Sequence, residues 1–246
     1  MNNNSYEYNY IDKQDIYILP NKVLKNKLGI TDQKELNNAE ALYVGQRLAE
    51  LRDNPIQIKN TSSLFEIHHQ LFQDLYEWAG KTRTVEISKP GTQFSPTSRF
   101  DQGIHYIDKL ITDYRKTNKN DKTTISKKLA IILDYVNYLH PFREGDGRTQ
   151  REFIYFLAKE KGYTLDLNPP DNQKIYETYM DGTINGNKEL LTELIQNCMK
   201  SDLRQTSLIN LPESRTFAED IAKLLGKNSS EDIKPPPNHS NNIPKP

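Results

Sequence analysis

The sequence predicts a mostly α-helical protein, a helical bundle that carries one small β-hairpin. Apolar residues recur in seven segments at the spacing of three and four that is typical of amphipathic helices. These segments cover residues 38–51, 63–79, 101–115, 123–139, 148–161, 171–181 and 187–199. Apolar and polar residues alternate in one stretch, 82–95, with Pro-Gly at 90–91. We therefore assign the chain to the all-α class with a single hairpin.

Local signals predict where several elements end. An extended run at 11–20 precedes a short segment for which Gly29 is expected to be a helix stop. Ser63 and Glu66 have the spacing of a capping box, so a helix is expected to begin at Ser63. Pro141 disfavours the helical conformation of the residue before it and should end the helix over 123–139 at His140.

The stretch at 82–95 is expected to form a hairpin. Pro90 and Gly91 suit the two central positions of a tight turn, because glycine accepts a positive φ there. A lone hairpin in a helical protein has no larger sheet to join. We therefore expect it to be exposed.

The composition limits the class of protein. The 246 residues include 33 Lys and Arg against 33 Asp and Glu, and a net charge of zero argues against a broad nucleic-acid surface. No apolar run approaches the roughly 18 residues of a membrane helix, and the start lacks a secretory pattern. The single Cys198 excludes an internal disulfide and a cysteine zinc site, and the adjacent His68 and His69 make a poor metal pair. We expect no nucleic-acid or membrane partner.

The chain divides into three predicted regions. Residues 1–37 form an N-terminal extension, 38–200 the helical domain and 201–246 a C-terminal extension. Within the last region, 217–225 has the pattern of a short helix, and 226–246 is rich in Pro, Asn and Ser, as disordered segments are. This change of composition raises the hypothesis that the chain is a fragment of a longer protein.

The chemically informative stretch is HPFREGDGRTQR, residues 140–151, between two predicted helices. A Gly-X-Gly loop at a helix start directs several backbone N–H groups into one concavity, an anion-binding nest. Arg148 and Arg151 share a face of the first helical turn and suit phosphate oxygens. A lone carboxylate beside phosphates, here Glu144, is what Mg²⁺ usually needs. A histidine such as His140 is suited to general base work near neutral pH.

Each of these features is weak by itself. A Gly-X-Gly is usually only a turn, a His before Pro is usually a helix C-cap, and a lone Glu in a loop is usually solvated. Their order within twelve residues makes a chance arrangement much less plausible. Together they indicate a nucleotide polyphosphate with Mg²⁺ and a histidine that activates an incoming hydroxyl.

The stretch resembles the signature of the Fic family, His-x-Phe-x-(Asp/Glu)-Gly-Asn-Gly-Arg-x-x-Arg. The matching positions are His140, Phe142, Glu144, Gly145, Gly147, Arg148 and Arg151. Asp146 is the mismatch. The segment LFEIHHQLFQDLYEWAGKTRTVEISK resembles the helix and flap hairpin upstream of the motif in this family, and YILPNKVLKNKLGI is similar to the start of Fic-domain effectors of pathogenic bacteria. The resemblance covers about residues 15–200.

This resemblance implies the Fic fold and the transfer of AMP from ATP to a Ser, Thr or Tyr hydroxyl of a target protein. It implies that His140 deprotonates that hydroxyl and that Glu144 holds Mg²⁺ on the α- and β-phosphates. Arg148 would meet the distal phosphates, and Arg151 would support the phosphate site. The implied nucleotide-binding positions are Glu144, Gly145, Asp146, Gly147, Arg148, Gln150 and Arg151.

By the same resemblance the hairpin at 82–95 is the flap. An exposed strand edge can pair with an extended target segment through main-chain hydrogen bonds, which positions a hydroxyl without reading much sequence. The expected target contacts are Ser88, Lys89, Gly91 and Thr92. The alternative is that the hairpin merely covers the core.

Asp146 stands where the family usually has Asn. An ionised carboxylate only accepts hydrogen bonds, and at about 4 Å with an effective dielectric near 20 it would repel a phosphate by up to about 4 kcal/mol before screening. Mg²⁺ or Arg148 could offset this, and Asp146 could be a second metal ligand. Our hypothesis is reduced or altered transferase activity. The alternatives are transfer of another nucleotide or a phosphoryl group, and a catalytically weak module that binds a target.

Many Fic proteins are held inactive by a helix with the motif Ser/Thr-x-x-x-Glu-Gly/Asn, whose Glu pairs with the second motif arginine. No segment here completes that motif, and Thr31 to Glu35 has only its first spacing. We expect either no autoinhibition or a separate small antitoxin that supplies a Glu to Arg151. We expect the protein in the bacterial cytoplasm, with delivery into host cells as the alternative.

Overall fold

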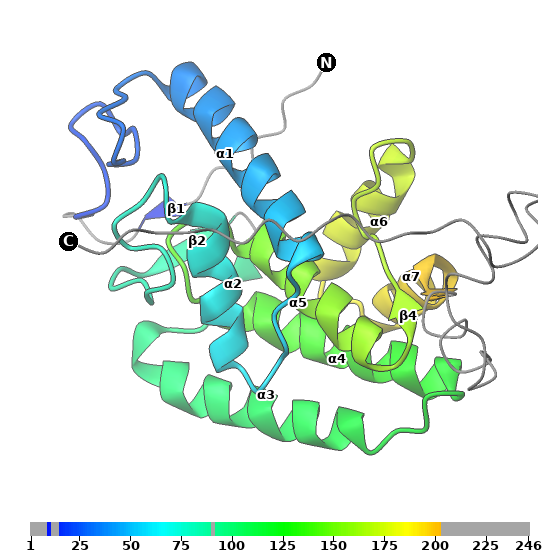
Figure 1. The fold of residues 1–246 in the computed structure, drawn as a ribbon. Helices are drawn as coiled ribbons and strands as arrows, with labels where there is room; N and C mark the ends of the chain where they lie inside the picture. Colours follow the sequence, from blue (N-terminus) through cyan, green and yellow to red (C-terminus); the bar gives the residue numbers. More distant parts are fainter. Residues whose placement is uncertain (1–8, 11–14, 90–91, 203–246) are drawn as a thin grey trace, which may run out of the picture. The chain divides into compact units, whose positions relative to one another are not determined.

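The computed structural model describes residues 9–10, 15–89 and 92–202 (Figure 1). Seven α-helices lie within these ranges, and each overlaps one of the seven predicted segments from 38–51 to 187–199. Their bounds are α1 Gln33–Asp53, α2 Ser62–Phe72, α3 Phe100–Arg115, α4 Lys122–Leu139, α5 Asp146–Glu160, α6 Gln173–Ile184 and α7 Lys188–Cys198. The predicted short helix at 217–225 and the disordered tail fall outside the described residues.

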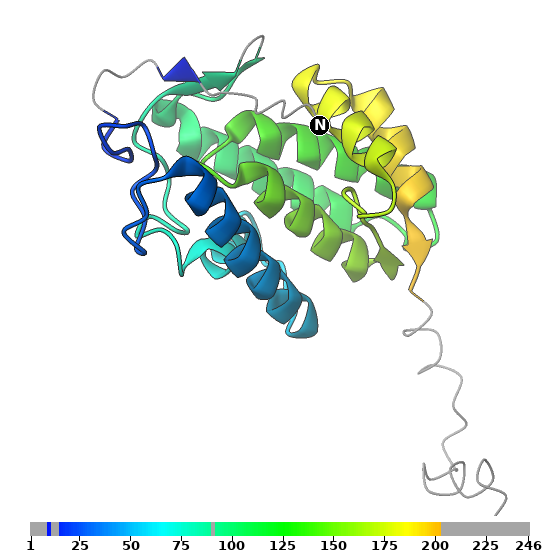
Figure 2. The same ribbon diagram turned by 90° about the horizontal axis from the view of Figure 1, so that it is seen from above.

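The core forms around α4. This helix packs against α3, α5 and α7, while α5 also packs against α2. Its buried residues recur at helical spacing and include Ile125, Leu129, Ile132, Leu133, Val136 and Leu139. Figures 1 and 2 show α1 on one side of α5 and the α6–α7 pair on the other. The all-α prediction is therefore correct. Across the described ranges, no helix has both the length and the apolar character needed to cross a membrane.

The predicted helix ends needed three corrections. α1 begins at residue 33, because Asp32 accepts a hydrogen bond from the Glu35 N–H at 2.8 Å and caps it. Ser63 does not cap α2, because it is the second residue of the helix. Its hydroxyl accepts from the Lys59 N–H at 3.0 Å. Residues 15–28 contain no helix, and Gly29 closes a turn with φ +69°.

α2 is also shorter than its apolar stripe. The helix ends at Phe72, whereas the stripe continues to Trp78. Leu75 and Trp78 are buried, but they lie in turns beyond the helix. The apolar stripe therefore indicates which residues are buried and not how long the helix is, because a turn can place apolar residues in the same core as a helix.

The hairpin prediction is confirmed. β2 (Ile87–Lys89) and β3 (Thr92–Gln93) are antiparallel, with Ser88 opposite Gln93 and Lys89 opposite Thr92. The expected exposure is wrong in one respect. β1 (Asn9–Tyr10) pairs with the other edge of β2, so the sheet order is β1-β2-β3. A second sheet of β4 (Tyr163–Thr164) and β5 (Lys200–Ser201) was not predicted.

Candidate active site

The motif residues run from the end of α4 through a tight loop into the first turns of α5. Gly145 is the N-cap of α5 and has φ +89°, where a side chain is strained. A Cβ at Gly145 would also lie 2.4 Å from the Phe72 ring of α2. The loop is anchored at Arg143, whose buried guanidinium pairs with Asp15 at 2.7 Å. The Gly-X-Gly loop therefore lies at a helix N-terminus, as predicted, and Phe72 of α2 packs against it.

His140 has the geometry of a general base. Its Nδ1 lies 3.1 Å from the Asn137 carbonyl, which can only accept, so Nδ1 carries the proton and Nε2 presents a lone pair. The ring is buried and stacked on Phe94, with centroids 3.7 Å apart. Burial lowers the pKa of His140 well below its usual value, and the charge of Lys89 acts in the same direction. The imidazole is therefore neutral near pH 7.

Asp146 faces this base. Its Oδ1 accepts from the Phe142 N–H at 3.2 Å, and its Oδ2 lies 3.5 Å from His140 Nε2. Burial raises the pKa of Asp146 well above its usual value, and the charge of Glu144 adds to this. Burial thus favours the neutral forms of both side chains and opposes an ion pair between them. The sequence expectation of an ionised, phosphate-repelling Asp146 did not include this burial.

Arg148 is held between two carboxylates. Its Nη2 lies 2.5 Å from Glu40 Oε1 on α1 and 3.6 Å from Glu144 Oε1. Its guanidinium also lies 4.8 Å from the centre of the Phe72 ring. Glu40 was not among the predicted site residues, because it lies 108 positions away in the sequence.

Arg151 differs from Arg148. Its guanidinium lies 5.4 Å from the Tyr176 ring centre and 5.3 Å from that of Tyr179. Among the residues that the structure describes, no carboxylate forms an ion pair with it. Glu35, the only sequence candidate for an inhibitory glutamate in a plausible place, is exposed at the start of α1. Gln150 donates to the Tyr179 hydroxyl and is buried, so it lies inside the site rather than at its mouth.

His68 supports the loop from α2. Its Nδ1 accepts from the Gly80 N–H at 2.8 Å, so Nε2 carries the proton and donates to the Glu144 carbonyl at 3.0 Å. Its ring stacks on Phe142 with centroids 3.7 Å apart. Burial lowers the pKa of His68 to about 3. It is a structural residue, as the sequence suggested, but one that fixes the motif loop.

Arg83 connects the hairpin to the base. Its fully buried guanidinium donates to the carbonyls of Val85 at 2.6 Å, Ser95 at 2.7 Å and His140 at 2.9 Å. The first two carbonyls belong to the two sides of the hairpin. Nothing in the local sequence predicts this role of Arg83, because a buried arginine has no pattern of its own.

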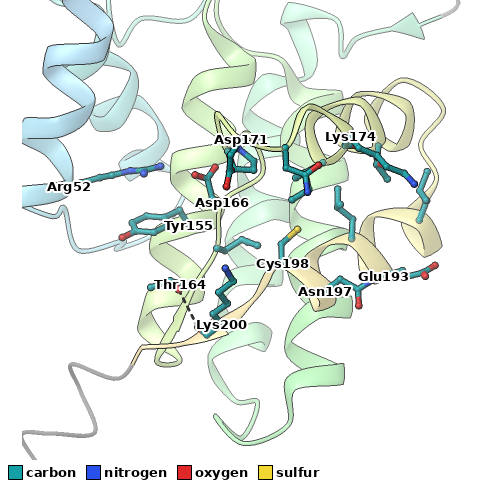
Figure 3. A pocket seen from close by; sticks show the side chains of 17 residues that line it. Arg52, Tyr155, Thr164, Asp166, Asp171, Lys174, Glu193, Asn197, Cys198 and Lys200 are labelled. Carbon is teal, nitrogen blue, oxygen red and sulfur yellow. Dashed lines mark hydrogen bonds between the residues drawn. The ribbon is translucent and has the colours of Figure 1, made fainter.

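Two cavities adjoin the motif. One of about 40 Å³ is lined by His140, Gly147, Gln150 and Lys89 of the flap, with Tyr179 and Met180 of α6. The other, about 460 Å³, is lined by Arg148, Arg151 and apolar residues of α1. A larger cavity of about 840 Å³ lies between Arg52 and Lys174 and contains no motif residue (Figure 3). The small cavity is the one that brings the predicted base and nest together with the flap.

Glu144 has the donor chemistry for a magnesium ion that is bound together with a nucleotide. Within the described ranges, no three His, Cys, Asp or Glu side chains converge. Glu144 is partly exposed at the N-terminus of α5, and its Oε1 accepts from the Gly145 N–H at 3.0 Å. A carboxylate has two oxygens, so it can still take a cation whose other ligands are phosphates and waters.

A helical core, a short hairpin and a nest loop with a buried histidine define a Fic-type fold and site. The profile of the Fic/DOC family matches residues 59–158. The chain is 34% identical to the protein y4lH of Sinorhizobium fredii over 146 residues, which are 58% of this chain and 74% of that protein. The chain therefore belongs to the Fic/DOC family.

Other relatives agree with this assignment. Protein adenylyltransferase VbhT of Bartonella schoenbuchensis is 34% identical over 76% of this chain, and the match spans only 39% of that protein. The N-terminal Fic domain of a translocated Bartonella quintana effector superposes with a TM-score of 0.68 at 23% identity, over 80% of this chain and 98% of that structure. BepC of Bartonella tribocorum, solved with bound AMPPNP, superposes with a TM-score of 0.66 at 21% identity, over 76% of this chain and 97% of that structure. These two structures support the fold.

Proposed function

We propose that the chain is a protein adenylyltransferase that transfers AMP from ATP to a hydroxyl of a target protein. The observation that carries this proposal is the neutral His140, with Nε2 presented beside the N-terminus of α5. Membership of the Fic/DOC family and the named activity of VbhT support it.

In this proposal His140 Nε2 takes the proton of the target hydroxyl. The hydroxyl oxygen forms a bond to the α-phosphorus while the bond from that phosphorus to the bridging oxygen breaks, and pyrophosphate leaves. The N–H groups of Gly147 and its neighbours in the first turn of α5 receive the phosphate charge. Mg²⁺ held by Glu144 would supply further charge neutralisation when bound.

The two arginines have different roles in this proposal. Arg151, which pairs with no carboxylate in the described part of the chain, would bind a terminal phosphate oxygen. Arg148, which Glu40 already binds, would act nearer to Glu144. This assignment differs from the sequence prediction, in which Arg148 binds the distal phosphates.

The target would bind by strand addition at the flap, with Ser88, Lys89, Gly91 and Thr92 as its contacts. Because β1 pairs with β2 at Ser88 and Ile87, we expect a target strand to replace β1 at that edge. Deleting residues 1–10 should then increase target labelling, whereas a target that adds to β3 would be labelled equally with or without them.

A separate antitoxin remains part of the proposal. The 460 Å³ cavity combines apolar α1 residues such as Val44 and Leu48 with Arg151. It would suit an amphipathic segment that carries one glutamate. For the location, the translocated Bartonella relatives support delivery from the bacterial cytoplasm into a host cell, which a reporter fusion would test.

The contact of Asp146 with His140 favours a second candidate, a weakly active module that binds a target. The test is incubation with Mg²⁺, a cell lysate and ATP labelled on the α- or the γ-phosphate, beside His140→Ala and the exposed-histidine control His105→Ala. Labelling from the α-phosphate that requires His140 supports AMP transfer. Labelling from the γ-phosphate indicates phosphoryl transfer, and nucleotide binding without labelling favours the module.

A further inference from the structure

Glu40 of α1 contacts the motif at Arg148, and both oxygens of its carboxylate accept hydrogen bonds. Its Oε1 accepts from Arg148 Nη2, and its Oε2 accepts from the hydroxyl of Tyr76. Tyr76 is buried, and its ring stacks on Trp78 with centroids 4.4 Å apart. The carboxylate of Glu40 is therefore held on one side by a rigid aromatic side chain and binds Arg148 on the other.

Arg148 has a second carboxylate within reach. Glu144 is four residues before it, a spacing at which side chains of a helical turn meet. The 3.6 Å from Nη2 to Glu144 is beyond hydrogen-bond distance, whereas the 2.5 Å to Glu40 is a close contact. Burial alone would lower the pKa of Arg148, but the charges of Glu40 and Glu144 raise it. The two carboxylates compete for one guanidinium, and Glu40 has the shorter contact.

We propose that Glu40 is a positioning residue that keeps Arg148 from closing onto Glu144, and so leaves Glu144 available to a divalent cation. This inference rests on the proposed function, because Glu144 is the proposed magnesium ligand. Without Glu40, the partly buried Arg148 would have Glu144 as its nearest carboxylate. Closing their 3.6 Å ion pair to hydrogen-bond distance would offset more of the charge that the cation needs.

The experiment measures binding rather than turnover. Calorimetry with AMPPNP at increasing Mg²⁺ gives the Mg²⁺ concentration for half-maximal nucleotide binding. We expect Glu40→Ala to raise this concentration by roughly fivefold, a typical coupling between side chains in contact, and Glu40→Gln to raise it less. Glu50→Ala is the matched control, because Glu50 also pairs with an arginine, Arg47, but at the far end of α1.

Arg148→Ala distinguishes positioning from a general structural effect. If Glu40 acts through Arg148, then removing Glu40 from the Arg148→Ala protein should leave its Mg²⁺ requirement unchanged. Tyr76→Phe, which frees Glu40 without removing its charge, should shift the requirement in the same direction as Glu40→Ala. Circular dichroism and the midpoint of thermal unfolding identify a variant that fails to fold. If Glu40→Ala does not fold, the Mg²⁺ requirement is compared between the wild type and Glu40→Gln.

An unchanged or lower Mg²⁺ requirement in Glu40→Ala and Glu40→Gln would overturn the inference, as would an equal shift in the Arg148→Ala background. These outcomes are separate from the proposed function. A wild-type protein that transfers AMP with His140 but does not respond to Glu40 would refute the inference alone. A protein whose Mg²⁺ requirement shifts as expected but that labels no target would refute the proposed activity alone.

Discussion

Replacing His68 by glutamine should make the protein less sensitive to acid. His68 accepts from the Gly80 N–H and donates to the Glu144 carbonyl, and only the neutral imidazole can do both. A protonated ring would put a second N–H against the Gly80 donor and bury a charge beside Phe142. Burial therefore lowers the pKa of His68 to about 3 in the folded protein, against 6.5 for its ordinary value.

The size of the effect follows from linkage. A base whose folded pKa is lowered contributes stability above its unfolded pKa, and this contribution is lost as the pH falls. Between pH 7 and pH 5 the unfolded chain takes up the proton and the folded protein does not, so the free energy of unfolding falls by about 2 kcal/mol. The loss continues toward about 5 kcal/mol below pH 3.

The assay is urea unfolding of the wild type and His68→Gln between pH 5 and pH 7. Glutamine has an acceptor and a donor but does not titrate, so at pH 7 the variant should be less stable by about 1–2 kcal/mol. The difference should then shrink by about 2 kcal/mol at pH 5, because every other titrating group is common to both proteins. His105→Gln, on the exposed face of α3, is the control. A difference that stays constant with pH would refute a neutral His68.

Three further predictions concern the loop, the hairpin and the mismatch. Gly145→Ala should lower the free energy of unfolding by about 3 kcal/mol or more, because the backbone is strained and the new methyl overpacks against Phe72. Gly29→Ala, which has open space around it, should lower it by only about 1–2 kcal/mol. Thermal unfolding measures both. Arg83→Met should lower stability by about 3–5 kcal/mol, because three buried carbonyls lose their donor, and should reduce labelling without changing nucleotide affinity. A carboxyl whose pKa is raised in the folded protein makes the wild type less stable as the pH rises from 4 toward 7. Asp146→Asn removes this effect, so its gain in stability over the wild type should grow with pH. Parallel profiles of stability against pH for the two proteins would contradict this.

The sequence predicted the features that depend on local patterns. The helices follow from apolar spacing, and the nest follows from two glycines beside a helix start. α4 ends at Leu139, as Pro141 predicts, but His140 has a left-handed backbone with φ +42° instead of the extended one that usually precedes a proline. Local competition explains the failed capping box, because the Ser63 hydroxyl is taken by the Lys59 N–H.

The parts that could not be predicted are contacts between distant segments. Glu40 and Arg148 are 108 positions apart, and His68 and Glu144 are 76 apart. Nothing in the residues around either pair indicates its partner. The pairing of β1 with β2 is of the same kind, since two residues near the N-terminus have no strand pattern of their own.

Asp146 illustrates how burial changes the meaning of a residue type. On charge alone, an aspartate in the nest should repel phosphate. Burial favours the neutral carboxyl, which resembles the amide of asparagine in shape and charge, so we expect less repulsion of phosphate than an ionised aspartate would cause. The difference from asparagine is instead the acidic proton, which Oδ2 can share with His140 Nε2 at 3.5 Å. In the proposed reaction a target hydroxyl would compete with that proton for the same lone pair, so we expect the mismatch to change the rate of transfer more than the binding of the nucleotide.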